Sequence, residues 1–73
     1  MNFETAKRVS NLLLDVNGLL NESIEEIKAD ASPEEFVEYR QNVGRIINSI
    51  FEDLLEPLFR NHPTLKPPGL EAD

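Results

Sequence analysis

The stretch SPEEFVEYRQNVGRIINSIFEDLLEPL, from Ser32 to Leu58, contains the clearest helix start and the densest group of apolar residues in the chain. Ser32 can cap the first helical turn, and Glu35 can hydrogen-bond back to the backbone of Ser32, which completes a capping box. Pro33 suits the first helical position, because its missing N–H would have no acceptor within the helix. These residues predict a helix that begins at Pro33.

Apolar side chains cover roughly half of the circumference of this predicted helix, when each residue advances by about 100°. They are Phe36, Val37, Tyr39, Val43, Ile46, Ile47, Ile50, Phe51, Leu54, Leu55 and Leu58. A helix that packs against one neighbour needs a narrower stripe. The width of this arc therefore predicts at least two neighbours, and in a short chain one of them can be a second copy of the same protein.

The first part of the chain predicts another amphipathic helix, capped by Asn2 and ending near Asp30. Its core line recurs at steps of three and four residues: Ala6, Val9, Leu13, Val16, Leu20, Ile24 and Ile27. The pair Asn17 and Gly18 could instead end one helix and begin a turn. The apolar line keeps its phase on both sides of this pair, which favours one continuous helix.

The short link through Ala31 and Ser32 makes the two predicted helices antiparallel neighbours. The sequence thus predicts an all-α protein: an antiparallel two-helix hairpin of residues 1–62, dimerising into a four-helix bundle, with a Pro-rich extended tail of residues 63–73. Pro57 should end or kink the second helix near its last turns, because it disrupts α-helical hydrogen bonding. The residues expected at a dimer or partner interface are Leu12, Leu19, Gly44, Ile47, Phe51 and Leu55.

Composition narrows the possible partners. The 73 residues include no cysteine and carry a formal net charge of −7. This charge repels nucleic-acid phosphates and anionic lipid surfaces, so we expect no nucleic-acid or membrane binding. Acidic side chains crowd the loop end, where the two helices are joined, and could form a surface for a basic partner: Glu22, Glu26, Glu34 and Glu38. With no targeting or membrane-spanning pattern in the sequence, we expect a cytoplasmic protein.

The sequence offers little catalytic chemistry. His62 is its single histidine, and a lone histidine near a helix end is more often solvated than catalytic. No Glu-x-x-His pair, EF-hand spacing, phosphate loop or nucleophile motif is present. We therefore expect no enzymatic activity, no cofactor and no metal site.

These observations favour a small acidic protein that acts by protein–protein interaction, as a homodimeric adaptor or regulator. One alternative is a small subunit, chaperone or toxin-neutralising protein that needs a different protein as its partner. A further alternative is a ligand-binding or enzymatic helical bundle, which would require a pocket between the helices.

Overall fold

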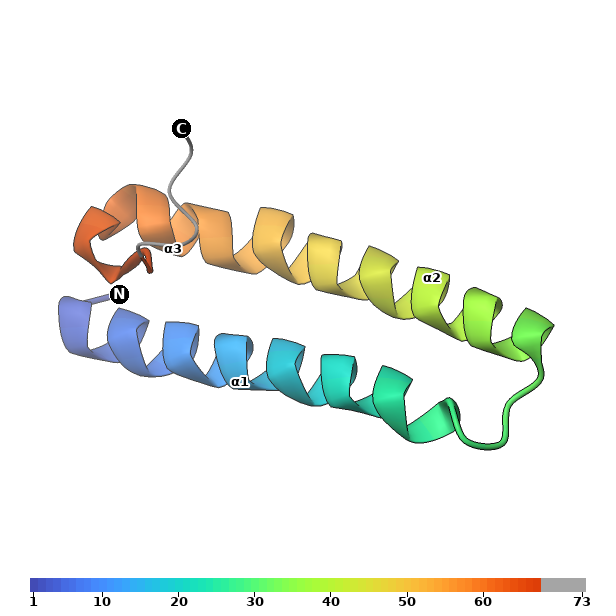
Figure 1. Cartoon of the computed structure of the whole chain (residues 1–73). Helices are drawn as coiled ribbons and strands as arrows, with labels where there is room; N and C mark the ends of the chain where they lie inside the picture. The colour runs from blue at the N-terminus through green and yellow to red at the C-terminus, as the bar shows by residue number, and fades with distance from the viewer. Residues whose placement is uncertain (68–73) are drawn as a thin grey trace.

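The computed structural model describes residues 1–67, and this part of the chain is helical with no strand. Two long helices, α1 (Phe3–Ile27) and α2 (Pro33–Ser49), lie side by side in antiparallel directions (Figure 1). The turn that joins them defines the loop end of the molecule, and we call the opposite end the open end. The predicted all-α antiparallel hairpin is confirmed.

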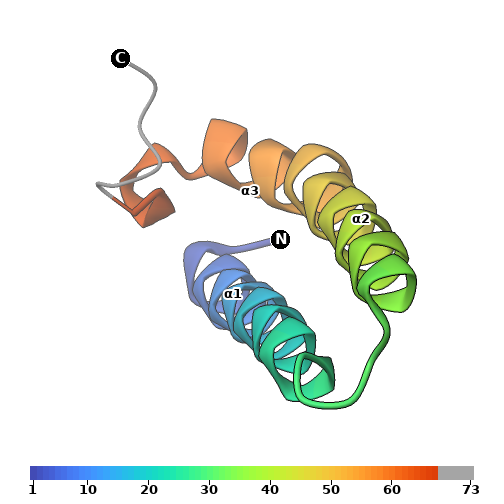
Figure 2. The same ribbon diagram turned by 45° about the vertical axis from the view of Figure 1, so that its right-hand side comes forward.

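The chain continues beyond α2 without leaving the helical conformation. A π-helical turn, η1 (Ile50–Leu55), leads into α3 (Glu56–Asn61), and a short 3-10 turn, η2 (Pro63–Leu65), follows. Both ribbon views place η2 beside the first turns of α1 (Figures 1 and 2). The open end is therefore closed by a fold-back of the chain.

Both predicted helix starts are present. The side-chain oxygen of Asn2 accepts a hydrogen bond from the backbone N–H of Thr5 at 2.9 Å. The Ser32 hydroxyl accepts one from the Glu35 N–H at 3.1 Å, and the Glu35 carboxylate accepts one from the Ser32 N–H at 2.8 Å. These bonds satisfy amide groups that a helix start would leave without a partner.

α1 runs through Gly18 without a break, as the continuous phase of its apolar residues predicted. Gly18 has no positive φ, and a Cβ built on it would meet nothing within 4 Å. Neither a turn nor close packing therefore requires glycine here. The helix ends at Ile27, and a turn covers residues 28–30, so the predicted end near Asp30 was slightly too late.

Pro57 neither ends the second helix nor leaves it a regular α-helix. Proline has no N–H to donate, and its ring would clash with the carbonyl four residues earlier in an α-helix. The widened turn of η1 directly precedes it, and the Glu56 N–H bonds to the carbonyl of Phe51, five residues back. This wider spacing lets the helical backbone pass the proline and continue to Asn61.

The π-helical turn changes which leucine faces the core. At about 100° per residue, a regular α-helix would turn Leu54 toward α1 together with Val43, and would turn Leu55 to the side. The observed order is the reverse, because Leu55 is 0% exposed and Leu54 is 50% exposed. The wide turn takes up about one extra residue, which delays the helical phase by about 100°. Leu55, which the sequence analysis expects at a partner interface, is for this reason buried within the single chain.

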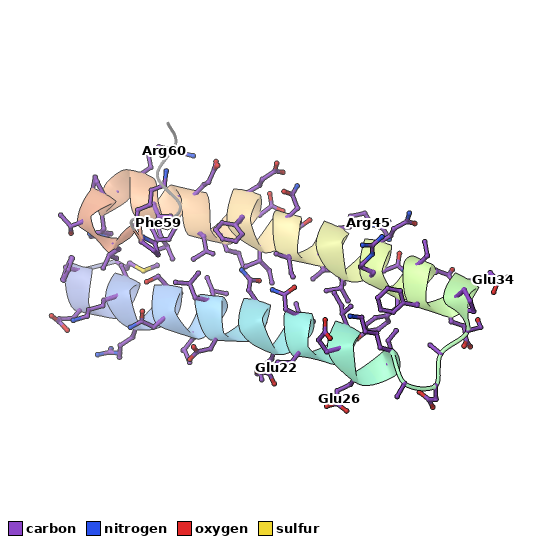
Figure 3. The ribbon with its side chains drawn as sticks, in the orientation of Figure 1. Glu22, Glu26, Glu34, Arg45, Phe59 and Arg60 are labelled. Atoms are coloured by element: carbon purple, nitrogen blue, oxygen red, sulfur yellow. The ribbon has the colours of Figure 1, made fainter. Side chains whose placement is uncertain are left out.

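The hydrophobic core lies at the open end, where the fold-back meets α1. Ala6, Leu55, Leu58 and Phe59 are buried together, and Figure 3 shows Phe59 between the helical layers. Leu65 of η2 packs against this cluster, so the first residues of the predicted tail are docked and helical rather than extended. The remainder of the predicted tail, including Leu70, lies outside the described residues.

Two polar residues are buried along the inner side of α1. Ser10 donates a hydrogen bond to the carbonyl of Lys7 at 3.1 Å. Asn17 is 7% exposed, and neither its amide nitrogen nor its amide oxygen has a hydrogen-bond partner among residues 1–67. A buried amide without partners costs about 1–3 kcal/mol, so the middle of α1 is a weak point of the hairpin.

Candidate functional site

Large apolar side chains remain exposed along one face of the hairpin. Leu12 and Leu19 of α1 are each 63% exposed, and Val16 between them is 41% exposed. Ile46 of α2 and Leu54 of η1 are each 50% exposed. We call these five residues the apolar face: Leu12, Val16, Leu19, Ile46 and Leu54.

Helical spacing and shared hollows place these residues on the same side of the molecule. Leu12, Val16 and Leu19 follow one another at steps of four and three, which aligns them along α1. A hollow at the open end is lined by Val9 of this side of α1 and by Leu54. A neighbouring hollow is lined by Leu54 and Ile46. The rows from α1 and α2 thus border a common surface.

The hollow at the open end is the largest concave feature of this surface. It is open to solvent, has a volume of about 560 Å³, and is lined on its apolar sides by Val9, Leu13, Leu54 and Leu58. Asp53 and His62 also border it, and the His62 ring packs edge-on against Phe3 with ring centroids 6.0 Å apart. An apolar floor with a few polar side chains suits an inserted aliphatic side chain.

The opposite side of the hairpin is covered from within the chain. Leu14 of α1 and Phe51 of η1 pack against the core cluster, and η2 adds Leu65 to the same contact. The chain therefore covers much of the apolar surface on this side, where Phe3 remains 43% exposed, whereas no described residue covers the apolar face.

The six residues expected at an interface do not form one surface. Leu12 and Leu19 lie on the apolar face, whereas Leu55 is fully buried in the core. Phe51 packs against the core, and Ile47 is half-buried. Gly44 is exposed, and no atom lies within 4 Å of a Cβ built there, so the single chain does not use it for close packing.

Three members of the apolar face are not among the residues that the sequence analysis expects at an interface. Val16 was assigned to the core line of α1, although its spacing to Leu12 and Leu19 also fits the outer row. The periodicity of the second helix places Ile46 in the broad apolar arc but does not show which side of the hairpin its side chain faces. Leu54 also belongs to this predicted arc, and its exposure results from the π-helical turn.

The four acidic residues predicted as a partner surface are exposed but point in different directions. Figure 3 shows Glu22 and Glu26 directed away from α2, while Glu34 projects from the start of α2. Glu38 is exposed one turn further along α2. Their carboxylates spread over the outer sides of two helices, so the hairpin does not gather them into one site.

Two other polar side chains, those of Tyr39 and Arg40, make contacts within the hairpin. The hydroxyl of Tyr39 donates a hydrogen bond to the Ser23 hydroxyl at 2.7 Å, which ties α2 to α1 near the loop end. The Arg40 guanidinium lies 5.9 Å from the centre of the Phe36 ring, a cation–π geometry on the surface of α2. Within residues 1–67, no group of three histidine or carboxylate side chains is placed to hold a metal ion.

The described helices include none with the length and hydropathy needed to cross a membrane. No protein-family model, curated protein sequence or solved structure matches this chain. The apolar face is therefore the feature from which a function can be argued.

Proposed function

We propose that this chain is a small non-enzymatic protein that acts by protein–protein interaction and uses the apolar face as its binding surface. A second copy of the chain is the primary partner, and the two hairpins form a four-helix bundle. The observation that carries the proposal is the row of five large apolar side chains that are 41–63% exposed on one side of the hairpin. An acidic adaptor or regulator in the cytoplasm is the role that this proposal assigns to it.

Burial of the apolar face would supply the driving force for dimerisation. Covering one half-exposed leucine or isoleucine returns about 1 kcal/mol, so the two apolar faces of a dimer return on the order of 10 kcal/mol. Association costs about 4–15 kcal/mol before any contact is made. The two terms are comparable, so the dimer should dissociate on dilution rather than remain permanent.

The size of the core also supports a partner. Five apolar residues of the described chain are buried, and four of them lie together at the open end. Chains of this length often need oligomerisation to complete a hydrophobic core. A second hairpin on the apolar face would extend the core over the middle of α1 and α2.

The proposal is tested by the molar mass of the full chain in solution, measured by light scattering over a wide concentration range. We expect twice the monomer mass of 8.3 kDa at high concentration and a fall toward that value on dilution. Leu19→Glu should abolish the dimer, because it would bury a charge in the interface. Val37→Glu is the matched control, because Val37 is 43% exposed on the outer surface of α2.

Two results would contradict a homodimer. A well-folded monomer at every concentration would show that the apolar face does not bind a second copy. A poorly folded or aggregating chain, recovered by co-expression with a different protein, would assign the face to a heterologous partner such as a larger subunit or a toxin.

A further inference from the structure

We infer that two copies pack with their loop ends at opposite ends of the dimer, so that α1 lies against α1 of the second copy. This inference rests on the proposed homodimer and specifies its arrangement. Val16 and Ile46 then lie nearest the two-fold axis, and Leu19 of each copy enters the open-end hollow of the other.

The position of the axis follows from the contact that ties the helices together. The Tyr39 hydroxyl is hydrogen-bonded to the Ser23 hydroxyl at 2.7 Å, so the two residues lie at similar heights along the hairpin. Val16 precedes Ser23 by seven residues, and Ile46 follows Tyr39 by seven. In antiparallel helices with equal rise per residue, Val16 and Ile46 therefore also lie at similar heights. Both are exposed on the apolar face, near its middle.

The shape of the apolar face differs on the two sides of this height. Toward the open end lie Leu12, which is 63% exposed, and the hollow lined by Val9, Leu13 and Leu54. Toward the loop end stands Leu19, which is 63% exposed. A two-fold axis at Val16 brings Leu19 of one copy to the height of Leu13 of the other, since each lies three residues from Val16. The projecting leucine thereby meets the hollow.

The distribution of charge favours the same arrangement. Seven acidic and three basic residues lie on the loop side of Val16 and Ile46: Glu22, Glu25, Glu26, Asp30, Glu34, Glu35 and Glu38, with Lys28, Arg40 and Arg45. The open side, within residues 1–67, carries five acidic and four basic residues: Glu4, Asp15, Glu52, Asp53 and Glu56, with Lys7, Arg8, Arg60 and Lys66. Stacking two loop ends would bring like charges together, whereas the opposed arrangement places each acidic end beside one that is nearly neutral.

Single-cysteine variants test this arrangement cleanly, because the chain contains no cysteine of its own. We expect Val16→Cys and Ile46→Cys each to form a disulfide-linked dimer by itself under mild oxidation, since each side chain meets its own copy at the axis. Glu22→Cys is the control that should stay monomeric on a denaturing gel, because Glu22 points away from α2. Far-UV circular dichroism confirms that each variant is folded.

The alternative arrangement predicts a different pattern. If the loop ends lie together, α1 of one copy faces α2 of the other, and a mixture of the Val16→Cys and Ile46→Cys chains should cross-link while neither does so alone. That result, in samples whose molar mass under reducing conditions is that of a dimer, would overturn the inferred arrangement and leave the homodimer standing. A monomeric mass for the native chain would overturn both.

The inferred contact of Leu19 with the open-end hollow of the second copy gives an independent test. Leu19→Ala should weaken dimerisation about tenfold or more, because the truncated side chain no longer fills the hollow. Val37→Ala should leave the dissociation constant unchanged, since Val37 lies away from the apolar face. Equal effects of the two variants would remove Leu19 from the interface.

Discussion

The two ends of the hairpin are stabilised in different ways. At the open end, α3 and η2 fold back and bury Leu55, Leu58 and Phe59 against Ala6. At the loop end, the specific contacts are polar: the capping box at Ser32 and the bond between Tyr39 and Ser23. Apolar burial on this scale contributes several kcal/mol, whereas each polar contact contributes about 1 kcal/mol. The open end should hold the fold together, and the loop end should open first.

The largest expected effect is at Leu55, which anchors the open end. Leu55→Ala should lower the free energy of unfolding by about 2–5 kcal/mol, because it removes a fully buried side chain and leaves a cavity. Urea denaturation at a concentration where the chain is monomeric measures the change. Leu54→Ala is the matched control and should cost less than about 1 kcal/mol, since Leu54 is half exposed. A larger loss for Leu54→Ala would contradict the shifted phase of η1.

A stabilising effect is expected at Asn17, between the two ends. Asn17→Leu should raise the free energy of unfolding by about 1–3 kcal/mol, because it replaces a buried amide without partners by an apolar side chain of similar size. The thermal unfolding midpoint reports the gain. Asn11→Leu, at an exposed position of α1, should leave the midpoint nearly unchanged. Destabilisation by Asn17→Leu would mean that the amide has a partner, such as a group of a second copy.

A smaller effect is expected where the capping box begins α2. Ser32→Ala should lower stability by about 1 kcal/mol, because the Glu35 amide loses its acceptor. Ser49→Ala serves as the control, since the Ser49 side chain makes no capping bond at the start of η1. Equal unfolding midpoints for the two variants in urea would show that the cap contributes nothing to stability.

An effect of similar size, confined to the loop end, is expected at Tyr39. Tyr39→Phe should cost about 0.5–1.5 kcal/mol, because it removes only the hydroxyl that bonds to Ser23. Hydrogen exchange should show faster opening of amides near the loop end and little change at the open end. Uniformly faster exchange along both helices would contradict the division of the hairpin into two separately stabilised ends.

Local features of the sequence were sufficient to predict most of the fold. The caps at Asn2 and Ser32, the unbroken apolar phase across Gly18 and the short link between the helices predicted the starts, the continuity and the antiparallel pairing. Each of these depends on residues within a few positions of one another. The candidate site was predicted less well, since only Leu12 and Leu19 of the apolar face were identified in advance.

The sequence by itself determined two amphipathic helices and the way they pair, because capping and periodicity act between neighbouring residues. Tertiary structure alone decided which side of the hairpin stays uncovered. Because of the π-helical turn before Pro57, Leu55 lies in the core and Leu54 lies on the surface. The fold-back of η2 covers part of the side of the hairpin opposite the apolar face. The physical reason is that the phase of a helix and the docking of a short turn depend on packing against distant residues, which periodicity does not encode.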